Sequence, residues 1–201
     1  MTTVILVTFL LTSMLTFWLA DHLVNRISRT YYLRQVDLFS TSPIQPGDIV
    51  LLGDSLTDLG IWHEMLPGVP VRNRGISNDT TEGVLERLDQ VISGKPKAVF
   101  LLIGTNDLPW FTYRNDALIL NNYNQILERC KELSPGTKVF VQSILPRVKA
   151  YTKRIRRINA ELKALADRHG FTFIDLYPSF VDDNGALQDQ ITNDHLHLLA
   201  D

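Results

Sequence analysis

Short apolar runs alternate with amphipathic stretches along most of the chain. Apolar runs predict buried strands at residues 49–53, 98–103 and 138–144, with a weaker strand at 69–73 and a last one at 171–175. Strands that are apolar almost throughout are typical of a parallel sheet whose two faces are both covered. The pattern therefore predicts an α/β fold with a parallel sheet.

Between these strands, apolar residues recur at the three- and four-residue spacing of a helix. One predicted helix begins near Thr80 and ends at Gly94, and two more cover residues 116–133 and about 155–165. Because helices alternate with strands and no internal repeat interrupts them, we expect one α/β sandwich. In such a sheet, ligands bind beyond the carboxyl ends of the strands, so the residues directly after each strand are candidates for the chemistry.

The amino-terminal segment has a different pattern. Residues 4–20 carry no charge, and Thr and Ser are their only polar side chains. Because about 20 apolar residues suit a membrane-spanning helix, we expect residues 1–24 to be a membrane anchor, 25–47 a connector and 48–201 the folded domain. A cleaved signal peptide and a buried helix are the alternatives. A cleaved signal peptide requires a basic amino-terminal start. It also requires a small residue shortly before the cleavage site, at the position that Trp18 occupies here.

The charges around this segment bear on which side of the membrane the domain would occupy. Arg26, Arg29 and Arg34 follow the segment, whereas only the α-amino group precedes it. The positive-inside rule favours a membrane-anchored chain whose domain lies on the cytoplasmic side. An extracytoplasmic domain is the alternative.

Composition narrows the class of protein. A length of 201 residues suits one domain with a sizeable core, and a hydrophobic content of 45% excludes a disordered chain. With 20 basic and 22 acidic residues, the net charge of −2 creates no general field for nucleic acid, so no nucleic-acid partner is expected. Cys130 is the only cysteine, which excludes a disulfide framework within the chain and any multi-cysteine metal site.

Four short polar motifs stand after predicted strands and near the carboxyl terminus. In chain order they are Gly-Asp-Ser-Leu at 53–56, Asn-Arg-Gly at 73–75, Gly-Thr-Asn-Asp at 104–107 and Asp-His-Leu-His at 194–197. Each motif alone is common turn or helix-cap chemistry. Their joint occurrence in this order is much less expected by chance.

In these motifs the chain resembles the SGNH (GDSL-type) hydrolase family, over about residues 48–197. The combination of Asn-Arg-Gly-Ile with Gly-Thr-Asn-Asp is similar to the branch of platelet-activating-factor acetylhydrolase subunits. The resemblance implies a flavodoxin-like three-layer αβα sandwich, to which the amino-terminal hydrophobic helix would be added. It also implies hydrolysis of esters, thioesters or related acyl groups with no cofactor and no metal.

The resemblance also implies a role for individual residues. Ser55 matches the family's nucleophile, and Asp194 and His197 match the pair that completes a catalytic triad, while Ser55, Gly75 and Asn106 match its oxyanion hole. This assignment makes chemical sense, because a serine hydroxyl is a poor nucleophile until an imidazole takes its proton. A carboxylate then holds that imidazole in the right tautomer. The oxyanion that forms needs hydrogen-bond donors aimed at its charge.

We expect the first of three functions, and the other two are its alternatives. The first is an esterase or lipase-like acyl hydrolase that acts on a small-molecule or lipid acyl ester. The second is an acyltransferase or carbohydrate deacetylase with the same residues, and the third is a non-catalytic hydrolase-like subunit; a homo-oligomer is compatible with all of them. Apolar residues beside the motifs are expected either to line an acyl pocket or to pack in the core or a lid. They are Trp62, Met65, Leu66, Trp110 and Phe111.

Overall fold

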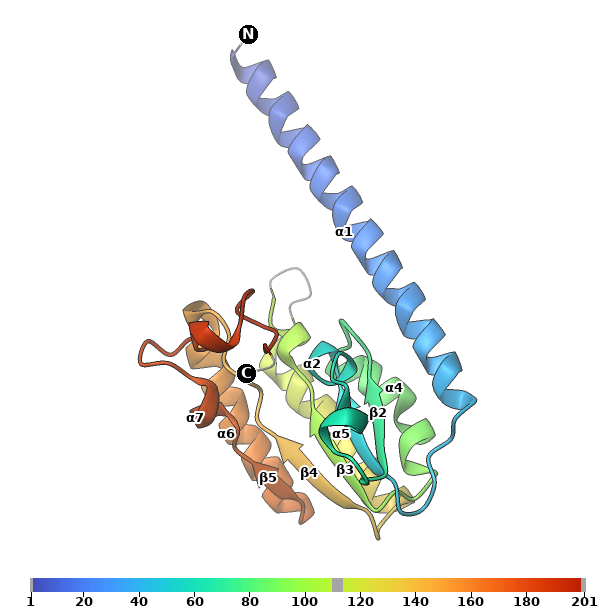
Figure 1. The fold of residues 1–201 in the computed structure, drawn as a ribbon. Coiled ribbons are helices and arrows are strands. Elements are labelled where there is room, and N and C mark those ends of the chain that lie inside the picture. Colours follow the sequence, from blue (N-terminus) through green and yellow to red (C-terminus); the bar gives the residue numbers. More distant parts are fainter. Residues whose placement is uncertain (1, 110–113, 200–201) are drawn as a thin grey trace.

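A computed structural model describes residues 2–109 and 114–199, and within them five strands form one parallel sheet (Figure 1). The strands are β1 (Ile49–Gly53), β2 (Val71–Gly75), β3 (Ala98–Leu102), β4 (Lys138–Gln142) and β5 (Thr172–Ile174). Their spatial order is β2-β1-β3-β4-β5, and every pairing is parallel. This is the strand order of flavodoxin-like folds. The predicted α/β class with a parallel sheet is confirmed.

Strand β2 begins later than its hydrophobic pattern predicts. The apolar run starts at Val69, but the strand starts at Val71. Pro70 lies between them and has no N–H with which to join the ladder. Its carbonyl still accepts a hydrogen bond of 2.9 Å from the Ile49 N–H at the start of β1. The proline therefore marks the edge of the pairing.

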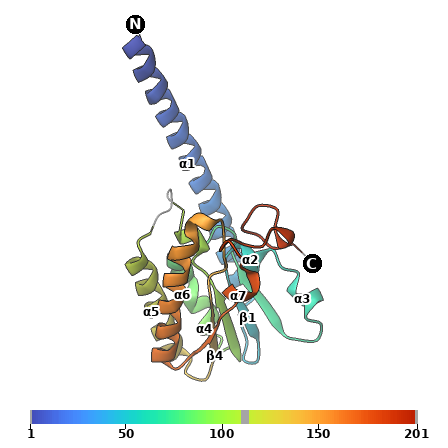
Figure 2. The same cartoon turned by 90° about the vertical axis from the view of Figure 1, so that its left-hand side faces the viewer.

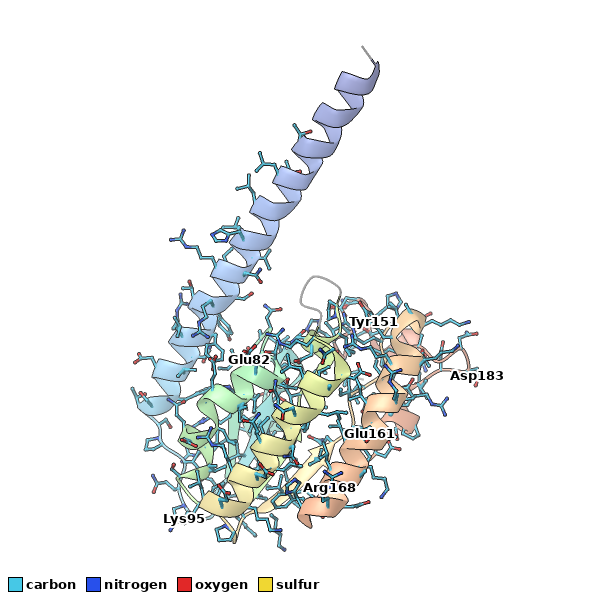
Figure 3. All side chains as sticks on the ribbon, turned by 180° about the vertical axis from the view of Figure 1, so that it is seen from behind. Glu82, Lys95, Tyr151, Glu161, Arg168 and Asp183 are labelled. Atoms are coloured by element: carbon cyan, nitrogen blue, oxygen red, sulfur yellow. The ribbon has the colours of Figure 1, made fainter. Side chains whose placement is uncertain are left out.

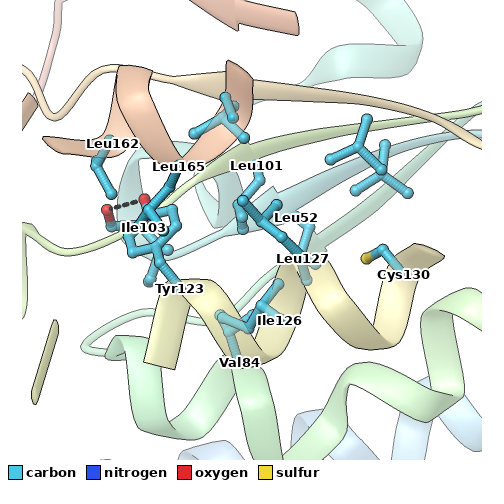
Figure 4. Close-up of a cluster of buried hydrophobic side chains, with 14 of the residues drawn as sticks. Leu52, Val84, Leu101, Ile103, Tyr123, Ile126, Leu127, Cys130, Leu162 and Leu165 are labelled. Atoms are coloured by element: carbon cyan, nitrogen blue, oxygen red, sulfur yellow. Dashed lines mark hydrogen bonds between the residues drawn. The ribbon is translucent and has the colours of Figure 1, made fainter. Parts of the chain in front are cut away.

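Three long helices cover one face of the sheet, as Figure 3 shows from behind. They are α4 (Thr81–Ile92), α5 (Asp116–Leu133) and α6 (Thr152–His169), and they pack side by side in that order. Side chains of Thr80 and Asn115 cap the first two by accepting hydrogen bonds from backbone N–H groups in the first turn. The core lies between these helices and the sheet (Figure 4), and there the buried Tyr123 hydroxyl donates a 2.7 Å hydrogen bond to the Ile103 carbonyl.

The opposite face of the sheet is covered only in part. Among the described residues, the short helices α2 (Ser55–Asp58) and α3 (Trp62–Met65) are the ones that pack against β1 and β2 on that side. In Figure 2, α5 and α6 lie on one side of the strands and α3 on the other. Leu51, Phe100 and Phe140 point to this face and remain half-buried, and the two phenylalanine rings stack with their centroids 4.5 Å apart. In the described residues, the second helical layer of the expected αβα sandwich therefore consists of these short helices.

Helix α1 (Thr2–Ser40) is one continuous helix of 39 residues. Its first half extends away from the sheet, and its second half packs beside α4 (Figure 1). In the part of the chain that the structure describes, no helix is long and apolar enough to cross a membrane. The predicted membrane anchor, and the membrane-anchored localisation that followed from it, are therefore wrong. The uncharged run at 4–20 is shorter than a usual span and continues within the same helix into Asp21 and His22.

The second half of α1 is bound to the sheet domain by specific contacts. Tyr32 is buried, and its hydroxyl donates a 2.8 Å hydrogen bond to the carbonyl of Gly83 in α4. The Arg74 guanidinium stacks over the Phe39 ring at 4.6 Å, and Ile44 is buried directly beyond the helix. The residues expected to form a connector are thus helical as far as Ser40 and belong to the packed structure.

Candidate active site

A tight turn after β1 presents Ser55 at the carboxyl edge of the sheet. The strand ends at Gly53, where a Cβ atom would lie 2.3 Å from the Leu102 carbonyl oxygen, so glycine alone fits. Asp54 caps the following helix, because its Oδ1 accepts a 3.0 Å hydrogen bond from the Leu56 N–H. Ser55 is then the first residue of α2. The local fold thus aims the predicted nucleophile toward the strand ends.

Ser55, His197 and Asp194 form one hydrogen-bonded chain. Nε2 of His197 lies 2.9 Å from Oγ of Ser55, and Nδ1 lies 2.5 Å from Oδ2 of Asp194. The other oxygen of Asp194 accepts hydrogen bonds from the backbone N–H groups of Leu196 (3.0 Å) and His197 (2.8 Å). These bonds, that from the His197 side chain foremost, lower the pKa of Asp194 to about 2. A charged Asp194 holds the tautomer with a proton on Nδ1, which leaves Nε2 to accept the Ser55 proton.

Asn106 lies after β3, in the short 3-10 helix η1 (Thr105–Asp107). Gly104 directly precedes this 3-10 helix and has a φ of 117°, in the left-handed region that favours glycine. The side-chain Nδ2 of Asn106 donates a 2.9 Å hydrogen bond to the carbonyl of Asp79, from the segment after β2. An amide nitrogen carries two hydrogens, so this bond sets the direction in which the second one points.

Gly75, the glycine expected in the oxyanion hole, is the last residue of β2, which packs against α2. Its backbone N–H donates a 2.8 Å hydrogen bond to Oδ1 of Asn73. A Cβ atom at this position would lie 2.2 Å from the backbone nitrogen of Asp58, so glycine is needed for β2 to pack closely on α2. Gly75 thus packs closely against α2, and its N–H already donates to the Asn73 side chain.

Sequence reasoning overlooked Asn78, which lies three residues beyond Gly75. Its φ of 65° places it in the left-handed region, which asparagine tolerates better than most residues. Within the described part of the chain, its backbone N–H has no hydrogen-bond partner. The only sequence signal for this turn was the Ser-Asn-Asp run between a strand and a helix.

Buried polar groups lie behind the nucleophile turn. Asp54 is 1% exposed, and burial raises its pKa to about 7. Its Oδ2, the Thr105 hydroxyl and Nε of Arg147 are buried without a hydrogen-bond partner among the described residues. No three or more His, Cys, Asp or Glu side chains in those residues are grouped to hold a metal ion.

An apolar cavity of about 390 Å³ opens beside the triad. Trp62 and Met65, two of the residues expected at an acyl pocket, line it, whereas Leu66 does not. Trp110 and Phe111 lie outside the described residues. Sequence reasoning missed the remaining apolar side chains, which immediately flank the nucleophile and histidine motifs. They are Leu56, Leu59, Ile61, Leu198 and Leu199.

A parallel α/β sheet with a Ser-His-Asp chain and an apolar cavity at its carboxyl edge has the architecture of a serine hydrolase. The chain belongs to the GDSL-like lipase/acylhydrolase family, whose model matches residues 51–201. The resemblance seen in the motifs is confirmed, and the chain is a hydrolase of this family.

Relatives and solved structures agree with this membership. Platelet-activating factor acetylhydrolase IB subunit alpha1 from Bos taurus is 30% identical over 161 residues, which are 75% of this chain and 68% of the relative. The structure of a candidate platelet activating factor from Streptococcus pneumonia has a TM-score of 0.80 at 25% identity and covers 90% of this chain and 91% of its own. A GDSL-like lipase from Bacteroides thetaiotaomicron has a TM-score of 0.70 at 26% identity, with coverages of 84% and 89%.

Proposed function

We propose that the chain hydrolyses carboxylic esters with Ser55 as the nucleophile. The observation that carries this proposal is the position of His197, whose two ring nitrogens lie within hydrogen-bond distance of Ser55 and Asp194. Nε2 of His197 takes the Ser55 proton while Oγ attacks the acyl carbonyl, and the imidazolium then gives that proton to the leaving alcohol. Water, activated by the same nitrogen, hydrolyses the acyl-enzyme and restores Ser55.

The oxyanion that forms in each attack is stabilised by donors at the strand ends. The Ser55 N–H, at the start of α2, and the Asn106 side-chain amide are the two donors that we propose first. Because the Gly75 N–H is engaged by Asn73, we infer that the third donor is the N–H of Asn78. That residue adjoins Asp79, whose carbonyl orients the Asn106 amide.

The cavity favours an ester with an apolar acyl chain, carried by a small molecule or a lipid. Its lining is mostly leucine, isoleucine, methionine and tryptophan side chains. A carbohydrate would bring hydroxyl groups that need polar partners, and burying them against this lining without such partners would cost free energy. The complete triad likewise favours a catalytic protein over a non-catalytic subunit.

Active-site labelling tests the proposal directly. A fluorophosphonate probe should label the wild-type chain, and p-nitrophenyl butyrate should be hydrolysed. The Ser55→Ala variant should lose labelling and at least about 10³-fold in kcat. Ser93→Ala, a change at an exposed serine that ends α4, is the matched control and should behave like the wild type. Labelling retained in Ser55→Ala would refute the assignment of the nucleophile.

A further inference from the structure

One carboxylate joins the nucleophile helix to the segment after β2. Asp58 is the last residue of α2, which begins with Ser55. Its Oδ2 accepts two hydrogen bonds from Ser77, one from the backbone N–H at 2.9 Å and one from the hydroxyl at 2.6 Å. Asp58 therefore holds the beginning of the segment 77–79 against the helix that presents the nucleophile.

A third donor to the same oxygen comes from α1. The hydroxyl of Tyr31 donates a 2.8 Å hydrogen bond to Oδ2 of Asp58. Burial, followed by this bond to Asp58, raises the pKa of Tyr31 above 10.0, so the hydroxyl keeps its proton at neutral pH and remains a donor. A residue far outside the catalytic motifs thus donates to the same carboxylate oxygen as Ser77.

The other end of the segment leads to the oxyanion donors. The carbonyl of Asp79 accepts the hydrogen bond from the Asn106 amide, and Asn78 lies between Asp79 and Ser77. The buried Asp79 carboxylate is held by Arg87 at 2.8 Å. The segment is therefore fixed at its far end by an ion pair and at its near end by Asp58.

We propose that Tyr31 is a positioning residue for the hydrolase site. Through Asp58 it fixes the segment 77–79, and through that segment it fixes the amide groups that face the oxyanion. This inference rests on the proposed function. Hydrogen-bond donors act in catalysis only when they are held close to the productive geometry by neighbouring contacts, and a misplacement of about 1 Å can cost 10²-fold in rate. Helix α1 is then a working part of the hydrolase rather than an extension of it.

Two tyrosine variants separate positioning from stability. Tyr31→Phe removes the bond to Asp58, whereas Tyr32→Phe removes an equally short bond from the same helix to the Gly83 carbonyl in α4 and leaves the bonds between Asp58 and Ser77 in place. We expect Tyr31→Phe to lower kcat for p-nitrophenyl butyrate about tenfold with little change in KM. Tyr32→Phe should lower the unfolding temperature with kcat within about twofold of the wild type.

Amide hydrogen exchange gives a readout that does not depend on activity. In Tyr31→Phe the backbone amides of residues 76–80 should exchange faster than in the wild type, and in Tyr32→Phe they should not. Equal exchange in the two variants, or equal losses of kcat, would overturn the positioning role. If the wild-type chain shows neither hydrolysis nor labelling of Ser55, the proposed function fails instead, and the exchange experiment still decides whether Tyr31 orders the segment.

Discussion

Nε2 of His197 lies 2.9 Å from Oγ of Ser55, although 142 positions separate the two residues in the chain. Ser55 follows β1, which lies between β2 and β3 in the sheet, and His197 lies in the final turns after β5. The Leu199 N–H donates a 2.9 Å hydrogen bond to the Ile191 carbonyl, which folds this last segment back on itself. The base is thus carried by a short loop with its own internal bonds, and the nucleophile by the turn that joins β1 to α2.

Replacing Asn106 should slow the chemical step. Asn106→Ala removes one of the proposed oxyanion donors, and such a loss usually lowers kcat by about 10²–10³-fold. KM should change little, because the bond strengthens only as charge develops on the carbonyl oxygen. Steady-state kinetics on p-nitrophenyl butyrate measure both constants, and Asn121→Ala, on the exposed side of α5, is the control. A change confined to KM would mean that Asn106 binds substrate rather than the transition state.

The buried carboxyl of Asp54 should make the folded protein less stable as the pH rises. Burial raises its pKa from 3.8 to about 7, so between these values the folded chain holds a proton that the unfolded chain releases. Stability therefore falls as the pH rises through this window, by on the order of a few kcal/mol. Asp54→Asn removes the titration while an amide oxygen can still accept the bond from the Leu56 N–H.

Thermal unfolding at about pH 4.5 and about pH 7.5 measures this effect, because these values lie near the two ends of the pH range in which Asp54 titrates. The drop in unfolding temperature from the lower to the higher pH should be smaller in Asp54→Asn than in the wild type. Asp37→Asn, on the exposed side of α1, should leave the wild-type drop unchanged. Equal drops in all three proteins would show that Asp54 does not titrate in this range.

Much of the candidate site could be predicted from the sequence, because its residues follow strands whose apolar runs are easy to recognise. Ser55 and Asn106 come directly after β1 and β3, and a parallel sheet gathers such residues at one edge. The pairing of Asp194 with His197 could be predicted from the family pattern, since one tight turn supplies both groups. At these positions the local sequence pattern and the topology of the sheet lead to the same expectation.

The remaining features depend on side-chain contacts that have no signature in the local sequence. This holds both for Tyr31 and Asp58, 27 positions apart, and for Asn73 and Gly75, only two positions apart. Nothing near Tyr31 indicates that its hydroxyl meets Asp58, and nothing near Gly75 indicates that the side chain of Asn73 takes its N–H. The membrane-anchor prediction for the amino-terminal segment was wrong for a related reason. The uncharged run at 4–20 does not reveal how far its helix extends. That helix continues through polar residues, and its second half packs on the sheet domain.

The apolar cavity should set the preference for acyl chain length. Leu59 and Met65 line it and are 67% and 60% exposed, so a bound acyl chain would cover them. Met65→Ser should lower kcat/KM for p-nitrophenyl hexanoate more than for the acetate, since each buried CH₂ contributes about 0.8 kcal/mol. Leu133→Ser, at an exposed leucine at the end of α5, is the control. Equal effects on both esters would exclude the cavity as the acyl site.

The two halves of α1 should differ in their contribution to the folded enzyme. The first half extends away from the sheet (Figure 1), and its Leu15, Leu19 and Leu23 side chains are more than half exposed. Deleting residues 1–24 should therefore leave the unfolding temperature and kcat unchanged. The second half buries Tyr32 and supplies hydrogen bonds to α2 and α4.

Deleting residues 1–42 removes this second half as well. The free energy of unfolding should fall by about 4 kcal/mol, because one buried aromatic side chain and its hydrogen bonds are lost. In a domain of this size that loss lowers the unfolding temperature by roughly 10 °C. Because the bond from Tyr31 to Asp58 is also lost, kcat should fall as in Tyr31→Phe. Circular dichroism melting and hydrolysis of p-nitrophenyl butyrate by the two truncated chains measure the difference. If both truncated chains match the full chain, the contacts of α1 contribute neither to stability nor to the site.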